Sequence, residues 1–129
     1  EEGKTLTADL LCAEYKRLTE LYYGPDMEAD DRIAMEWARI PHFYYNYYVF
    51  QYATGYAAAI ALSRRILGEG ESAVKDYLGF LSGGCSKDPI SLLKGAGVDM
   101  TSPEPVEQAL ELFDRLLDEM EELTEATNG

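Results

Sequence analysis

The chain has 129 residues, which is enough for one domain with a single core. Acidic residues outnumber basic ones by 24 to 11, and residues 99–125 carry ten of the acids with a single arginine. Such a surface repels nucleic-acid phosphates, and no stretch has the roughly 18 uncharged apolar residues that span a membrane. Charge and hydropathy therefore exclude nucleic acid and membrane as expected partners.

The first half of the chain carries start and stop signals for three helices. Thr7 is a predicted N-cap for the first helix, which Gly24 and the proline after it should end. A short second helix is predicted over residues 31–38. It should end before Pro41, because a proline disfavours helical backbone in the residue before it. The third and longest helix is predicted over residues 43–67, closed by two glycines that follow it.

Three further helices are predicted in the second half: over residues 72–81, over residues 89–94 with Asp88 as N-cap, and from Pro103 onward. The last of these carries an apolar stripe that must dock on another surface. The stripe consists of Val106, Leu110, Phe113, Leu117 and Met120. No segment alternates like a strand, so we predict an all-α fold of about six helices. Residues 1–129 should form a single helical segment, with a long Tyr-rich central helix and an acidic amphipathic C-terminal helix.

The two cysteines, Cys12 and Cys85, lie far apart and show no metal-binding or redox spacing. We interpret them as reduced thiols. The sequence shows no basic and apolar secretion signal, so a cytoplasmic location is expected.

Tyrosines are concentrated in one stretch. Six of the ten lie in residues 44–56, and His42, the only histidine, comes just before them. On the predicted long helix four of these tyrosines share one face, beside a gap at Gly55. They are Tyr45, Tyr48, Tyr52 and Tyr56. Two interpretations stay open at this point. Spacing alone favours aromatic packing in a core, whereas neutral hydroxyl donors beside an imidazole could bind peptide carbonyls or a developing oxyanion.

The stretch WARIPHFYYNYYVFQYATGYAAAIALSRRIL, residues 37–67, resembles the C-terminal helical region of oligoendopeptidase F. Enzymes of that family are zinc metallopeptidases related to thimet oligopeptidase. The likeness continues through LTADLL (6–11), YYGPD (22–26), GGCSKDPISLLKGAGVDMTSPEPVEQAL (83–110) and the acidic last helix. The resemblance implies that the chain is the C-terminal part of a larger metallopeptidase catalytic domain, which cleaves oligopeptides.

Family members bind zinc through His-Glu-x-x-His on a helix and a further downstream Glu. This chain has one histidine, so that motif cannot occur in it. In the family the motif lies N-terminal to the region matched here, and the chain opens with Glu rather than Met. We therefore expect a fragment that binds no zinc and cleaves no peptide alone. Its expected partners are the oligopeptide substrate and the N-terminal remainder of the enzyme, and surfaces left uncovered could pair two copies.

The resemblance also implies roles for individual residues. His42 and Tyr48 match family positions that stabilise the tetrahedral transition state. Tyr52, and less directly Tyr44 and Tyr45, match the substrate-binding wall. A tyrosine of the thimet branch occupies the turn where this chain has Gly55, which leaves the role of that turn open.

Two other interpretations compete with a peptidase segment. The acidic last helix and the aromatic stripe could serve a free-standing helical interaction module, and an upstream His-Glu-x-x-His in the same reading frame would distinguish the two. A metal site built on His42 is disfavoured, because no acid lies three or four residues after it.

Overall fold

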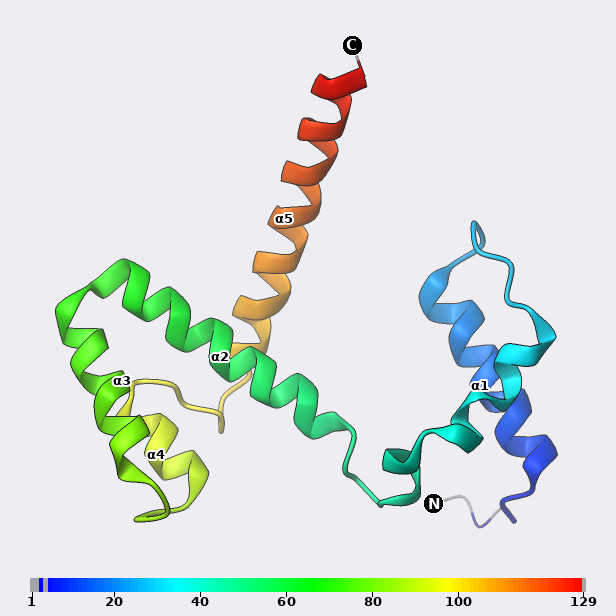
Figure 1. The fold of residues 1–129 in the computed structure, drawn as a ribbon, viewed down its shortest axis with the longest axis horizontal. Coiled ribbons are helices and arrows are strands. Elements are labelled where there is room, and N and C mark those ends of the chain that lie inside the picture. The colour runs from blue at the N-terminus through cyan, green and yellow to red at the C-terminus, as the bar shows by residue number, and fades with distance from the viewer. Residues whose placement is uncertain (1–2, 4, 129) are drawn as a thin grey trace. The chain divides into compact units, whose positions relative to one another are not determined.

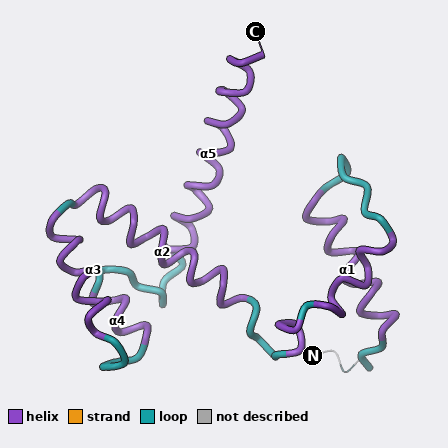
Figure 2. The backbone as a smooth tube through the Cα atoms, in the orientation of Figure 1, coloured by secondary structure: helices purple, strands orange, loops and turns teal. Residues whose placement is uncertain are grey.

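The structure is a computed structural model that describes residues 3 and 5–128, and it divides the chain into two compact units, residues 1–49 and 50–129. The described backbone consists of helices and loops without a strand, so the predicted all-α class is confirmed (Figures 1 and 2). The elements are α1 (Ala8–Tyr23), the 3-10 helices η1 (Asp31–Arg39) and η2 (Pro41–Tyr44), α2 (Phe50–Glu69), α3 (Glu71–Gly83), α4 (Pro89–Gly95) and α5 (Glu104–Asn128). Membership of both units in one catalytic domain stays a prediction.

The predicted limits of the first helix are confirmed. The Thr7 hydroxyl accepts a hydrogen bond from the Leu10 amide at 3.2 Å, which satisfies one of the unpaired donors at the start of α1. At the other end Gly24 adopts a left-handed φ of +77°, and its amide donates to the Glu20 carbonyl.

In the first unit η1 runs beside α1 (Figure 1). The Trp37 indole N–H donates to the Cys12 sulfur at 3.4 Å, and the Tyr15 hydroxyl donates to the Glu36 carboxylate at 3.0 Å. Burial, reinforced by the bond to Glu36, raises the pKa of Tyr15. These contacts hold η1 against α1, and they thereby fix the point from which residues 40–49 continue.

The long third helix predicted from residue 43 is wrong at its start, because α2 begins only at Phe50. Pro41 forces the residue before it into an extended conformation, and Tyr47 has a φ of +54°, which a right-handed helix cannot contain. Tyr45 and Tyr48 therefore do not share a helical face with Tyr52 and Tyr56, as the sequence pattern predicted.

Smaller differences concern the other helices. The second helix is 3-10 rather than α, and α2 runs through Gly68 to Glu69 before Gly70 ends it. The last helix begins at Glu104, and Asp88 caps α4 as predicted by accepting from the Ser91 amide at 2.9 Å. These boundary shifts of one or two residues reflect the usual fraying of helix ends.

The core of the second unit is built from small residues. Ala61 and Leu62 of α2 pack against Ala96 and Val98, which follow α4, and all four are less than 9% exposed. Larger side chains of α3, α4 and the loop after α4 surround them, namely Tyr77, Phe80, Leu93 and Met100. Alanine side chains let the backbone of the loop approach α2 closely, which explains the alanine-rich stretch of that helix.

The α5 helix contacts α2 near its own start, where the Arg64 guanidinium donates to the Gln108 carbonyl at 3.2 Å. Farther along, the predicted apolar stripe stays exposed, with Leu110 at 63%, Phe113 at 62% and Met120 at 58%. The described part of the chain thus leaves this stripe without a covering surface. Within residues 3 and 5–128, no helix is both long and apolar enough to span a membrane.

Arg65 connects three parts of the second unit. Its guanidinium binds Glu69 on its own helix, Asp76 of α3 at 3.5 Å, and the Ala96 carbonyl. The following residue, Gly97, has a left-handed φ of +81°, and a methyl group at that position would collide with the Arg65 guanidinium. The backbone conformation therefore favours glycine there, and a methyl group would also displace the guanidinium.

We therefore expect Gly97→Ala to lower the free energy of unfolding by about 1–3 kcal/mol, from left-handed strain and displacement of Arg65. The matched control is Gly79→Ala in α3, where a methyl group enters open space and should stabilise the helix by about 0.5–1 kcal/mol. Urea unfolding of both variants measures the difference. Equal effects of the two substitutions would contradict the strain and the contact assigned to Gly97.

Candidate functional site

The predicted site residues at the start of the tyrosine-rich stretch lie on a run of short turns, residues 40–49, which we call the His/Tyr segment. Each turn closes with a backbone bond over three residues: Phe43 N–H to the Ile40 carbonyl, Tyr45 N–H to the His42 carbonyl, and Tyr48 N–H to the Tyr45 carbonyl, all at 3.2–3.3 Å. Such turns place neighbouring side chains in different directions, so the segment offers several groups within a short length of chain.

Three of the predicted residues come together through their rings. His42 stacks on Tyr48 with ring centres 5.7 Å apart and planes 17° apart, and Tyr45 meets Tyr48 edge-on at 6.0 Å. All three residues are exposed, with Tyr48 at 38% and Tyr45 at 63%. Within the described chain these rings do not fill a core, and they present an imidazole beside two phenol groups at the surface.

The two residues between His42 and Tyr45 are fastened to the rest of the first unit. The Phe43 ring packs edge-on against Tyr15 of α1, with ring centres 6.2 Å apart. The Tyr44 hydroxyl donates to the Ala38 carbonyl of η1 at 3.0 Å. Consecutive residues of the His/Tyr segment are thus tied to α1 and η1, which limits how far His42 can turn.

Tyr52 and Gly55, the remaining predicted positions, lie on α2 in the second unit. Tyr52 is 58% exposed, and the position of Gly55 faces open space. The structure therefore brings together His42, Tyr45 and Tyr48 and gives the Tyr44 hydroxyl a backbone partner.

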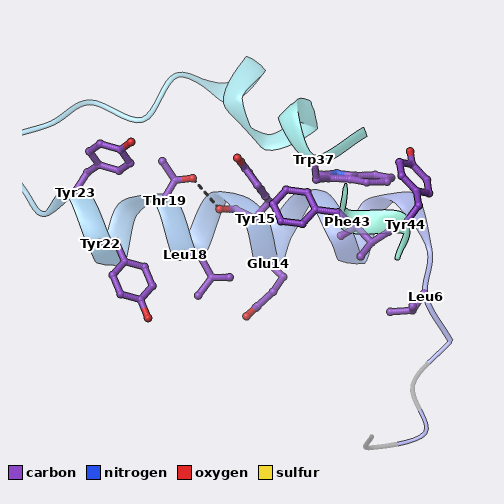
Figure 3. Close-up of a pocket in the computed structure, with 11 residues that line it drawn as sticks. Leu6, Glu14, Tyr15, Leu18, Thr19, Tyr22, Tyr23, Trp37, Phe43 and Tyr44 are labelled. Carbon is purple, nitrogen blue, oxygen red and sulfur yellow. Dashed lines mark hydrogen bonds between the residues drawn. The ribbon is translucent and has the colours of Figure 1, made fainter. Parts of the chain in front are cut away.

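The first unit also contains an apolar groove of about 630 Å³ along α1 (Figure 3). Figure 3 shows the side chains of Trp37, Phe43 and Tyr44 at one end and those of Tyr22 and Tyr23 at the other. This groove was not predicted from the sequence. Trp37, the only tryptophan of the sequence, lies on the short second helix and was the signal that could have revealed it.

A second feature that the sequence analysis missed is the left-handed conformation of Tyr47. A bulky residue rarely adopts a positive φ, and Asn46 beside it is the more common choice for that conformation. The turn at Tyr47 lies inside the His/Tyr segment, keeps α2 from beginning before Phe50, and allows Tyr48 to lie back against His42.

The residues that the structure describes do not fit a zinc site. In that part of the chain no three His, Cys, Asp or Glu side chains are grouped closely enough to hold a metal ion. No chemical step through zinc is therefore assigned to these residues.

The ring stack makes a prediction that nuclear magnetic resonance can check, because His42 gives the only imidazole signals of the chain. Tyr48→Phe keeps an aromatic ring over His42 and should leave its ring-proton shifts almost unchanged, whereas Tyr48→Leu should remove the ring-current shift. Tyr56→Leu, at an exposed position of α2, is the control. Unmoved His42 signals in Tyr48→Leu would show that the rings do not stack in solution.

Comparisons with known proteins agree on one family. The model of peptidase family M3 matches residues 1–112 of the chain. The chain is 58% identical over 123 residues to oligopeptidase PepF of Bacillus subtilis, an alignment that covers 95% of this chain and 18% of that protein. It is 47% identical to the group B oligopeptidase PepB of Streptococcus agalactiae, over 95% of this chain and 20% of that protein.

A solved structure shows the same likeness. The crystal structure of oligoendopeptidase-F from Enterococcus faecium matches with a TM-score of 0.85 and 48% identity, over 96% of this chain and 24% of that one. The chain spans about a fifth of the length of the curated relatives it matches. The resemblance drawn from the tyrosine-rich stretch is confirmed: the chain belongs to peptidase family M3.

Proposed function

We propose that this chain is the C-terminal part of the catalytic domain of a zinc metalloendopeptidase that cleaves oligopeptides. Membership of family M3 and 58% identity to an oligopeptidase support the class of reaction. The observation that carries the assignment of a site is the stack of His42 on Tyr48, exposed at the surface rather than packed in a core. The activity belongs to the longer protein, and the chain alone is expected to be inactive.

The His/Tyr segment would act by donating hydrogen bonds to the substrate. When a peptide carbonyl is attacked, its oxygen gains negative charge, and fixed donors aimed at it lower the barrier because they need no reorganisation. The Tyr48 hydroxyl is a neutral donor of this kind, and an imidazole N–H of His42 can supply a second. Stacking holds the two rings parallel, so both groups belong to one surface. Tyr45 and Tyr52 are assigned to the peptide backbone of the substrate.

Zinc would supply Lewis-acid chemistry to the complete enzyme, from ligands that we place in the N-terminal remainder. We assign His42, Tyr45, Tyr48 and Tyr52 to the substrate and the developing oxyanion, and none of them to zinc. The cytoplasmic location and any pairing of two copies stay predictions.

An interaction module remains the second candidate, because one observation favours it. The stripe of α5 stays exposed over Leu110, Phe113 and Met120, and exposed apolar stripes of this kind bind partners. The complete reading frame separates the two candidates: a His-Glu-x-x-His motif upstream in the same frame supports the peptidase, and its absence supports the module.

Tyr48→Phe in the full-length enzyme tests the proposed mechanism. The change deletes the hydroxyl and keeps the ring over His42, so folding should be nearly unaffected. If the hydroxyl binds the oxyanion, kcat should fall by roughly two to three orders of magnitude with a modest change in KM. Steady-state hydrolysis of a fluorogenic oligopeptide measures both constants.

Tyr77→Phe is the matched control, since Tyr77 lies on α3 and packs against Phe80 in the second unit. It should leave kcat within about twofold. Equal and small kinetic effects of Tyr48→Phe and Tyr77→Phe would remove Tyr48 from the active site.

A further inference from the structure

His42 lies on a very short helical piece. η2 contains four residues, and the residues on both sides of it, Ile40 (φ −97°, ψ 101°) and Tyr45 (φ −105°, ψ 113°), are extended. No side chain caps its start, and Pro41 has no amide hydrogen to contribute a backbone bond. One turn of helix is unstable by itself, because its few backbone bonds do not offset the entropy lost in ordering it.

A side-chain hydrogen bond spans the break between η1 and η2. The Tyr44 hydroxyl donates to the Ala38 carbonyl at 3.0 Å, across six positions of the chain. The loop that this bond closes contains Pro41 and His42. η1 is itself held on α1 by the Trp37 indole, whose N–H donates to Cys12. The Tyr44 bond therefore links the His42 turn to a fixed part of the first unit.

We propose that Tyr44 is a positioning residue, which holds His42 in its orientation toward the substrate rather than binding the substrate itself. A tyrosine hydroxyl has one hydrogen to donate, and the Ala38 carbonyl accepts it here. Donating to a peptide carbonyl or an oxyanion would require breaking that bond. The inference rests on the proposed function of His42 and replaces the substrate-binding role that the family resemblance gave to Tyr44.

The size of the expected effect follows from the hydrogen bond. A net bond of this type shifts a local equilibrium by a factor of roughly 2 to 12, far less than the loss of an oxyanion donor. In the full-length enzyme Tyr44→Phe should lower kcat within this range and leave KM nearly unchanged, because the substrate contacts remain. Tyr77→Phe is again the control and should leave both constants unchanged.

A double-mutant cycle separates positioning from direct binding. If Tyr44 acts through His42, Tyr44→Phe should lower kcat in the wild-type background and have no further effect in His42→Ala. If Tyr44 were merely structural, Tyr44→Phe would lower the melting temperature equally in both backgrounds. Its effect on kcat would then not depend on the presence of His42. Additive losses of kcat, or a rise in KM alone, would overturn the proposal.

The isolated chain supplies a readout that does not depend on activity. Tyr44→Phe should move or broaden the imidazole signals of His42, the only histidine, whereas Tyr77→Phe should not. Unmoved signals in Tyr44→Phe would overturn the positioning role. Full activity of His42→Ala would instead reject the function proposed for His42, and this inference with it. A large loss of kcat in His42→Ala, together with additive losses in the double variant, would reject the positioning role of Tyr44 and leave the function proposed for His42 standing.

Discussion

The break in the helix before Phe50 is the constraint on which the candidate site depends. Pro41 keeps the residue before it extended, and the left-handed Tyr47 prevents a right-handed helix from forming across residues 45–49. Without this break Tyr45 and Tyr48 would lie along a continuous helix, and the turn that lays Tyr48 against His42 would not exist. Pro41 and Tyr47, which break the helix, are thus the immediate neighbours of the candidate site residues His42 and Tyr48, and strained backbone is often retained at functional sites.

Packing within each of the two units holds some elements in place and leaves much apolar surface exposed. In the first unit, bonds from Trp37 and Tyr15 hold η1 on α1. In the second, alanines of α2 meet the loop after α4 under the Arg65 guanidinium. No large side chain among the described residues is fully buried, and the groove on α1 and the stripe on α5 remain exposed. In the proposed enzyme the remainder of the chain would pack on these two surfaces.

Local signals in the sequence predicted the helices well, because caps act over three or four residues. Thr7, Gly24 and Asp88 each took the predicted place at a helix end. The sequence could not predict the φ of Tyr47 or the partner of the Tyr44 hydroxyl, since both depend on contacts between elements rather than on local preference. His42 and Tyr48 came from family resemblance. The helical periodicity that grouped Tyr45 and Tyr48 with Tyr52 and Tyr56 was wrong, because it assumed unbroken helix.

The affinity of the full-length enzyme for a tetrahedral transition-state analogue, such as a phosphinic peptide, tests the central claim most directly. If His42 and Tyr48 bind the developing oxyanion, the Kd of the analogue should rise in His42→Ala and Tyr48→Phe by the same factor by which kcat/KM falls. Binding of a substrate-like peptide without the tetrahedral group should change much less. An unchanged Kd of the analogue in both variants would contradict the account and return the His/Tyr segment to a purely structural role.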